Sequence, residues 1–232
     1  MKIEVIENFL GMKLAVIPPG NFFMGSLESE IDRDIDEGPR HRVTISSPLI
    51  IGIYPVTQAQ YERVMHQNYS RFKSPDRPAE MVSHPDASDF CSRLSEITGD
   101  AYSLPTEAQW EYACRAGIES TFAFGDDPRN LDDYAWHAGN SSNTTHSVGQ
   151  KKANAFGLYD MHGNVWEWCR DHWSAQGYNP TQNRDPESQG FTYNLRGGCY
   201  YSHPQALRSA KRFGYNQSNR YDSVGFRVIR VD

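Results

Sequence analysis

The chain of 232 residues carries a formal net charge of −6 and contains 38% hydrophobic and 22% charged residues. This composition supplies enough apolar material for a sizeable core and excludes a largely disordered chain. The acidic balance argues against a nucleic-acid-binding protein, because such proteins concentrate positive charge. No stretch is long and apolar enough to predict a membrane span, and the first residues lack the apolar core of a signal peptide. We therefore expect a cytoplasmic or a phage- or virus-associated protein.

Short strands are predicted at three places in the first quarter of the chain and at one place near its end. Residues 13–17, 41–45 and 49–53 are rich in β-branched residues, and the last two of these runs are expected to pair with each other. Residues 225–230 alternate in polarity and predict a further strand. The long stretch from 122 to 193 is rich in Gly, Asn, Asp and Ser and predicts ordered loops.

Three helices are predicted from their start signals and apolar spacing. Thr57 is a candidate N-cap for a helix over residues 57–65, and a second helix is expected over residues 87–98. A third is expected over residues 106–116, where Thr106 and Gln109 fit a capping box.

The cysteines carry no metal-binding or disulfide pattern. Their spacing contains no Cys-x-x-Cys pair and no tight cluster with histidine, which disfavours a zinc site. We expect them to be small buried apolar side chains. The residues concerned are Cys91, Cys114, Cys169 and Cys199.

A series of motifs runs in order from about Gly11 to Arg230. It resembles the formylglycine-generating-enzyme (sulfatase-modifying factor) family. The resemblance implies an α+β chain with a C-type-lectin-like fold, much irregular structure, and a single domain over residues 1–232. The motifs are IPPGNFFMGS (17–26), EGPRHRV (37–43), YPVTQAQY (54–61), YSLPTEAQWEYA (102–113), NAFGLYDMHGNVWEW (154–168), RGG (196–198) and GFR (225–227).

Four residues of the resembled scaffold are expected to hold loops together. Trp166 and Trp168 can fill space between loops, and Arg196 and Arg227 can donate to loop carbonyls through their planar guanidinium groups.

The turn in the central motif implies a calcium site, as in several family members. The ligands would be the carboxylates of Asp160 and Glu167 and the carbonyls of Gly163 and Val165, which are the hard oxygen ligands that Ca²⁺ prefers. In the alternative interpretation, Asp160 caps the turn and Glu167 pairs with an arginine.

The residues that perform catalysis in the resembled enzymes are absent. Those enzymes bind copper through two cysteines that follow the Gly-Gly pair, because Cu(I) prefers sulfur ligands. Here the matching positions are Ser202 and Leu207, and Cys199 is the nearest thiol. We therefore expect no catalytic cofactor and no oxidase activity.

The C-terminal segment, residues 196–230, predicts a ligand-binding surface. Small clusters of Tyr, Ser, Asn, Gly, His and Asp alternate there with scaffold residues, and this is the composition of an antibody paratope. The expected ligand is a protein or another macromolecule. The clustered residues are Tyr200, Tyr201, Ser202, His203, Phe213, Gly214, Tyr215, Asn216, Ser218, Asn219, Tyr221, Asp222 and Ser223.

The same segment resembles the variable region of diversity-generating retroelement target proteins, which share the C-type-lectin-like fold. Their variable codons are mutated at adenines, and the residues reachable from asparagine codons include every residue in these clusters. The resemblance implies a binding protein whose surface is diversified. Two alternatives stay open: an oxygen-dependent oxidase with a substitute site, and a catalytically inactive subunit of a larger assembly.

Overall fold

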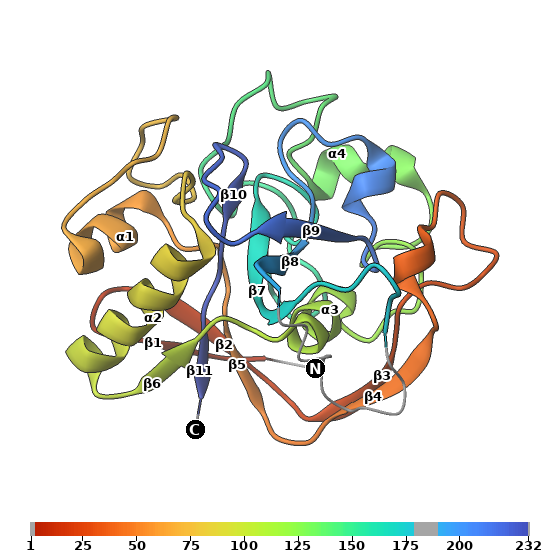
Figure 1. Cartoon of the computed structure of the whole chain (residues 1–232), viewed down its shortest axis with the longest axis horizontal. Coiled ribbons are helices and arrows are strands. Elements are labelled where there is room, and N and C mark those ends of the chain that lie inside the picture. Colours follow the sequence, from red (N-terminus) through yellow and green to blue (C-terminus); the bar gives the residue numbers. More distant parts are fainter. Residues whose placement is uncertain (1–2, 179–189, 232) are drawn as a thin grey trace.

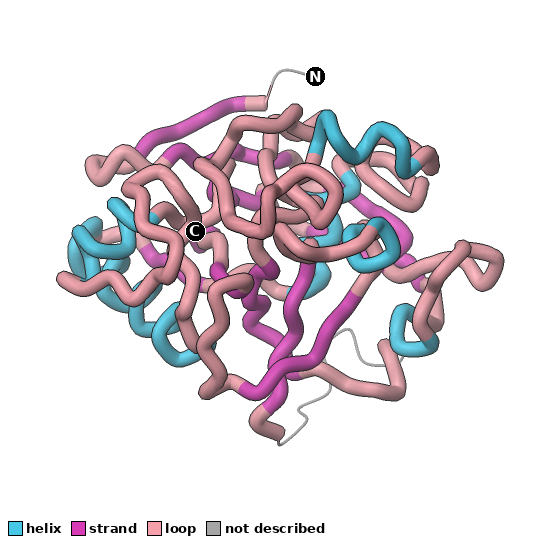
Figure 2. The backbone as a smooth tube through the Cα atoms, turned by 90° about the horizontal axis from the view of Figure 1, so that it is seen from above, coloured by secondary structure: helices cyan, strands magenta, loops and turns pink. Residues whose placement is uncertain are grey.

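The computed structural model describes residues 3–178 and 190–231 (Figure 1). Most of the backbone consists of loops and turns wrapped around short strands (Figure 2). Such loops need buried side chains to hold them, because they contribute few backbone hydrogen bonds of their own.

A five-stranded antiparallel sheet forms one side of the molecule. Its strands lie in the order β1 (Glu4–Glu7), β2 (Lys13–Ile17), β5 (Leu49–Gly52), β11 (Ile229–Val231) and β6 (Ala101–Ser103). β11, the last strand in the sequence, therefore lies between β5 and β6, which come much earlier in the sequence. Hydrophobic side chains cover both faces of this sheet.

Alternation along the sheet assigns neighbouring residues to different cores. Ile50 and Leu14 face a core that contains Trp168 and Phe226, whereas the adjacent Ile51 faces a second core. The second core contains Trp110, which is fully buried. This arrangement follows from the two-residue period of a strand.

A four-stranded sheet carries the C-terminal segment. Its order is β10 (Val224–Gly225), β7 (Trp166–His172), β8 (Thr192–Arg196) and β9 (Arg212–Asn216). β10 runs parallel to β7, and the other pairs are antiparallel. The chain from β8 to β10 is therefore held by hydrogen bonds at the beginning, at β9 and at the end.

A separate hairpin-like pair, β3 (Gly20–Met24) and β4 (His41–Ile45), completes the strands. The prediction that residues 41–45 pair with 49–53 was wrong, because β4 pairs with β3 while β5 pairs with β2 and β11. The predicted strand 225–230 is two strands, β10 and β11, separated by residues 226–228, and the Arg227 side chain between them is fully buried.

The three long helices begin with capping boxes. α1 (Gln58–Met65) is capped by Thr57 and α3 (Glu107–Arg115) by Thr106, as predicted. α2 (His84–Thr98) begins three residues before the predicted start, because Ser83 and Asp86 form a capping box there. The short helices are η1 (Ile35–Glu37), η2 (Pro128–Asn130), α4 (Leu131–Tyr134) and η3 (Pro204–Leu207).

All four cysteines are free and buried, which confirms their prediction as core residues. Within residues 3–178 and 190–231, no helix combines the length and the apolar character needed to cross a membrane.

Candidate ligand-binding surface

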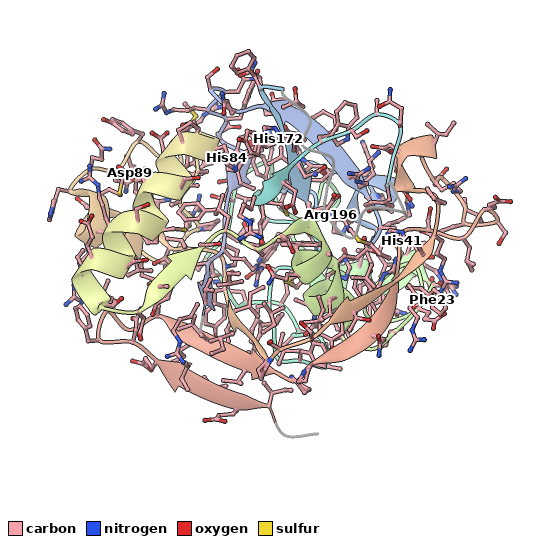
Figure 3. All side chains as sticks on the ribbon, turned by 60° about the horizontal axis from the view of Figure 1, so that its bottom comes forward. Phe23, His41, His84, Asp89, His172 and Arg196 are labelled. Carbon is pink, nitrogen blue, oxygen red and sulfur yellow. The ribbon has the colours of Figure 1, made fainter. Side chains whose placement is uncertain are left out.

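Buried arginines fix the inner side of the C-terminal segment. The Arg196 guanidinium donates to the carbonyl oxygens of Ser209, Ala210 and Lys211 and pairs with Glu111 on α3. Arg196 lies in the interior of the molecule, next to α3 (Figure 3). The prediction that this side chain binds loop carbonyls is confirmed.

Arg212, on β9, makes the second of these attachments. Its Nε and Nη2 atoms lie 2.6 and 2.9 Å from the two carboxylate oxygens of Glu107, at the start of α3. Bidentate geometry of this kind fixes orientation as well as distance. The next residue, Phe213, points to the opposite face of the strand.

Arg227 and Glu167 form the third attachment. Both Glu167 oxygens lie 2.6 Å from Arg227 nitrogens, and one of them also accepts from the Trp110 indole at 2.7 Å. Arg227 in addition donates to the carbonyls of Gly52 and Tyr159, as predicted for a loop anchor. The pair has no exposed surface, so water does not screen its charges and each compensates the other.

Three large aromatic side chains project outward from this frame. The exposed fractions are 48% for Tyr201, 44% for Phe213 and 44% for Tyr221. The half-buried Tyr215 joins two of them, because its ring lies 5.6 Å from that of Phe213 and 4.9 Å from that of Tyr221. Beneath it lies Trp168, with ring centroids 6.4 Å apart.

We call the outward group the aromatic surface. It consists of Tyr201, Phe213, Tyr215 and Tyr221 together with the exposed polar residues His203, Asn216 and Ser218. Of the other predicted residues, Asn219 and Asp222 are half-buried at its edge. Asp222 accepts from Arg71 at 2.5 Å.

Three predicted contact residues are instead buried. The Tyr200 ring packs edge-on against Phe72, and Ser202 accepts from the Cys199 backbone N–H. The Ser223 hydroxyl lies 3.0 Å from the Tyr201 hydroxyl. These residues support the loops that carry the aromatic surface, and their side chains are too buried to contact a ligand.

Gly214 is half-buried and packs against another side chain. A Cβ atom at this position would collide with the Trp173 indole, which is itself held by a hydrogen bond to Asp36. Glycine is therefore required by packing at residue 214, and the structure gives it no contact role.

Sequence reasoning missed several residues that support the surface. Tyr193 lies between His84 and His172, with ring centroids 3.7 and 4.1 Å away, and the two histidines lie close together in Figure 3. Glu80 is buried below the surface and accepts from the Phe72 N–H. These side chains come from distant segments with no recognisable motif, so no local signal could have found them.

Burial changes the protonation of Glu80. It raises the pKa of this carboxyl to about 7, with a smaller contribution from the nearby Asp222. Within the described residues, its Oε2 has no hydrogen-bond partner. A buried carboxyl in this state is neutral or only partly ionised at neutral pH.

The positions that would bind copper in the resembled enzymes lack thiols. Leu207 is fully buried against Phe122, Leu131 and Ala135, and Ser202 contacts Cys199. Burial raises the pKa of the Cys199 thiol, which disfavours the thiolate that a copper site requires. Among the residues that the structure describes, no three His, Cys, Asp or Glu side chains are grouped to hold a metal.

The predicted calcium ligands are in place on the turn but are engaged otherwise. Glu167 is paired with Arg227, and Asp160 accepts from the Gly149 N–H at 2.8 Å and from the Asn164 amide at 3.3 Å. Burial raises the Asp160 pKa to about 6. As arranged, the two carboxylates match the alternative in which Asp160 caps the turn and Glu167 pairs with an arginine. Calcium binding stays a prediction of the resemblance.

Comparison with known proteins identifies a family and several relatives of this chain. The family described as "Sulfatase-modifying factor enzyme 1-like domain" matches residues 7–231. Chaperone protein LppX of Paenibacillus barcinonensis is 30% identical over 93% of this chain and 88% of its own length. Formylglycine-generating enzyme of Mus musculus is 27% identical over 93% of this chain and 74% of the enzyme.

Two solved structures cover 99% of this chain and 99% of their own. PvdO from Pseudomonas aeruginosa has a TM-score of 0.90 and 32% identity. Treponema denticola variable protein 1 has a TM-score of 0.86 and 24% identity, and at this identity it bears on the fold alone.

The fold is thus the C-type-lectin-like fold of the formylglycine-generating-enzyme type, an α+β architecture with much irregular structure. The chain belongs to the sulfatase-modifying factor, or formylglycine-generating enzyme, family.

Proposed function

We propose that this protein is a non-catalytic binding protein that contacts a protein or another macromolecule through the aromatic surface. The observation that carries the proposal is the exposure of Tyr201, Phe213 and Tyr221 on a frame fixed by buried arginines. Exposed aromatic rings held in place lose little conformational entropy when they bind, and they supply large contact areas.

We further propose that the surface is diversified, as in a diversity-generating retroelement target. A surface that changes in sequence must not carry the fold. The outward residues Tyr201, Phe213 and Tyr221 fit this condition because they make ring contacts and few polar contacts, while the arginine anchors face inward. The likeness to variable protein 1 supports the same idea at the level of the fold.

The first experiment tests contact. A photo-crosslinking phenylalanine analogue is placed at residue 201, 213 or 221, and the protein is irradiated in the organism that makes it. We expect a macromolecular adduct from at least two of these positions. Matched controls place the same analogue at Phe9 and Phe23, which are 61% and 40% exposed on other parts of the chain. Equal adducts from the controls, or none from the aromatic surface, would contradict the binding role.

The second experiment tests diversification. The gene is sequenced in independent isolates, together with its neighbourhood. We expect substitutions concentrated at the codons for residues 200–223 and a near-repeat of that stretch beside a reverse transcriptase gene. Uniformly distributed substitutions without such a repeat would remove this part of the proposal and leave the binding role standing.

An oxidase is the second candidate, because a family relative of 27% identity is formylglycine-generating enzyme. Incubation with Cu(I) and oxygen, using a cysteine-containing peptide, tests it through aldehyde formation detected with a hydrazide reagent. We expect no aldehyde, since Ser202 and Leu207 stand where thiolates are needed. Aldehyde production would establish the oxidase. The remaining candidate, an inactive subunit of an assembly, would show as a stable complex on purification.

A further inference from the structure

A second surface feature is formed by other residues, on the loop between β3 and β4. Ile31 and Ile35 on this loop are 81% and 87% exposed, and Leu27 is 48% exposed. In Figure 1 the loop projects on the side of the molecule opposite α1 and α2. Single exposed aliphatic residues are common, but a group of them beside a cavity indicates a site of interaction.

Such a cavity is present. It encloses about 370 Å³ between the β3–β4 loop, residues 119–128 and η3. The buried Phe122 ring forms part of its wall, and Leu27, Ile31, Pro128 and Pro204 contribute further apolar surface. The cavity can therefore accept an apolar group from solvent.

The charged groups around the cavity are predominantly acidic. Glu30, Asp32, Glu119 and Asp126 line it, whereas Arg208 is the one basic residue in its lining. Glu119 is paired with Arg40, and Asp126 accepts from the backbone and hydroxyl of Thr121. The exposed carboxylates of Asp32 and Asp126 have no basic partner among the described ion pairs.

Arg208 is not available to a ligand. All five of its N–H donors are engaged, by the carboxylates of Glu30 and Glu37 and by the carbonyls of Gln205 and Asp32. The carboxylates of Glu30 and Glu37 therefore share one guanidinium, and this arrangement adds to the net negative charge around the cavity. An anionic ligand would meet repulsion here, and a cationic one would meet attraction.

We propose that this cavity docks a segment of a partner protein in which an apolar side chain lies next to Lys or Arg. The apolar side chain enters the cavity beside Phe122, and the basic group meets Asp32 and Asp126. A chain segment fits better than a small molecule, because the exposed Ile35 extends the apolar surface beyond the cavity. None of the lining residues belongs to the aromatic surface, although Pro204 directly follows its member His203, so the proposal does not depend on the function proposed above.

A library of random peptides displayed on phage tests the proposal with the intact protein. We expect the selected peptides to be enriched in an apolar residue within two positions of Lys or Arg. Selection is repeated on a Tyr201→Ala, Phe213→Ala variant, which must retain the enrichment. Loss of the enrichment in that variant would place the peptides on the aromatic surface and overturn the cavity proposal.

The most enriched peptide is then labelled with a dye and titrated by fluorescence anisotropy. Asp32→Asn with Asp126→Asn removes two charges and keeps the side-chain shapes, and we expect about fivefold weaker binding, as for two exposed ion pairs. Ile31→Ser should weaken binding about threefold through loss of apolar contact. A matched control, Glu96→Gln with Asp100→Asn, removes two exposed charges on the other side of the molecule and should leave the affinity unchanged.

Melting temperatures of all variants are measured to confirm folding, which is expected because the changed side chains are exposed. Two results would overturn the proposal. One is equal affinity in the cavity variants and the control. The other is full competition by isopentylammonium at the concentration at which the peptide itself binds, which would make the site one for a small amine.

Discussion

The inner and outer sides of the C-terminal segment differ in the contacts that their side chains make. On the inner side, Arg196, Arg212 and Arg227 each pair with a buried glutamate and bind backbone carbonyls. On the outer side, Phe213 and Tyr221 both contact the half-buried Tyr215 through ring contacts, and Phe213 also packs against Trp166. The difference indicates that the segment's position is determined from within, so that its outer side chains can differ without loss of the fold.

The largest effect is expected from breaking the inner side. Arg227→Met leaves the Glu167 carboxylate buried without its partner, which should lower the free energy of unfolding by about 3–5 kcal/mol. Denaturant unfolding measures it. The control Arg71→Met removes an ion pair whose arginine side chain is 68% exposed, and we expect a change of less than about 1 kcal/mol. Similar losses in both variants would contradict the contrast between the two sides.

A pH-dependent effect is expected from Glu80, which is buried near Asp222 of the C-terminal segment. Because its folded pKa is raised to about 7 from 4.5, its contribution favours folding at low pH and is lost as the pH rises through 7. The stability of the wild type relative to Glu80→Gln should therefore fall by about 2–3 kcal/mol between pH 5 and pH 8. Comparing the two proteins cancels the titration of His84 and His162, whose pKa values burial lowers to about 4. A pH-independent difference would show that Glu80 is ionised throughout.

Gly214 sharpens the boundary between the buried frame and the outer surface. Gly214→Ala introduces a methyl group against Trp173 and should destabilise the protein by about 1–3 kcal/mol in thermal or denaturant unfolding. Asn216→Ala, on the same strand but exposed, should change stability by less than about 0.5 kcal/mol. If Gly214→Ala has no cost, residue 214 belongs with the residues that can vary.

The smallest effect on stability is expected when Ca²⁺ is added or removed. Since Arg227 already neutralises Glu167, adding Ca²⁺ or EDTA should leave the melting temperature unchanged within the error of the measurement. A stabilisation that grows with Ca²⁺ concentration would instead show that the turn binds the ion and that Arg227 gives up the carboxylate.

Local signals predicted the helices well. Thr57 and Thr106 are N-cap signals that can be read within four residues of sequence, and in the structure each of them begins a capping box. Strand pairing was not predictable in the same way, because the partner of β5 on one side is β11, almost 180 residues later. The Arg227 side chain illustrates the same limit: its motif suggested an anchor for carbonyls, while its pairing with Glu167 depends on how two distant strands meet.

The candidate site was predicted as a segment but not as a surface. Composition identified residues 200–223, yet adjacent tyrosines have opposite environments: Tyr200 is buried against Phe72, and Tyr201 is exposed. No periodicity marks this difference, because the chain there is irregular. The cavity beside η3 left no sequence signal at all, since its residues come from three separated segments.

The central place of β11 in the five-stranded sheet has a consequence for biosynthesis. β5 and β6 are made early but cannot be joined until residues 229–231 have left the ribosome, since β11 lies between them. Until then, the unpaired backbone N–H and C=O groups along one edge of each strand remain available to other chains, and pairing between distant segments is slow. A nascent protein of this topology therefore completes its fold only after the whole binding segment has been synthesised. Every variant of that segment must then pass through the same last step, the insertion of β11 between β5 and β6.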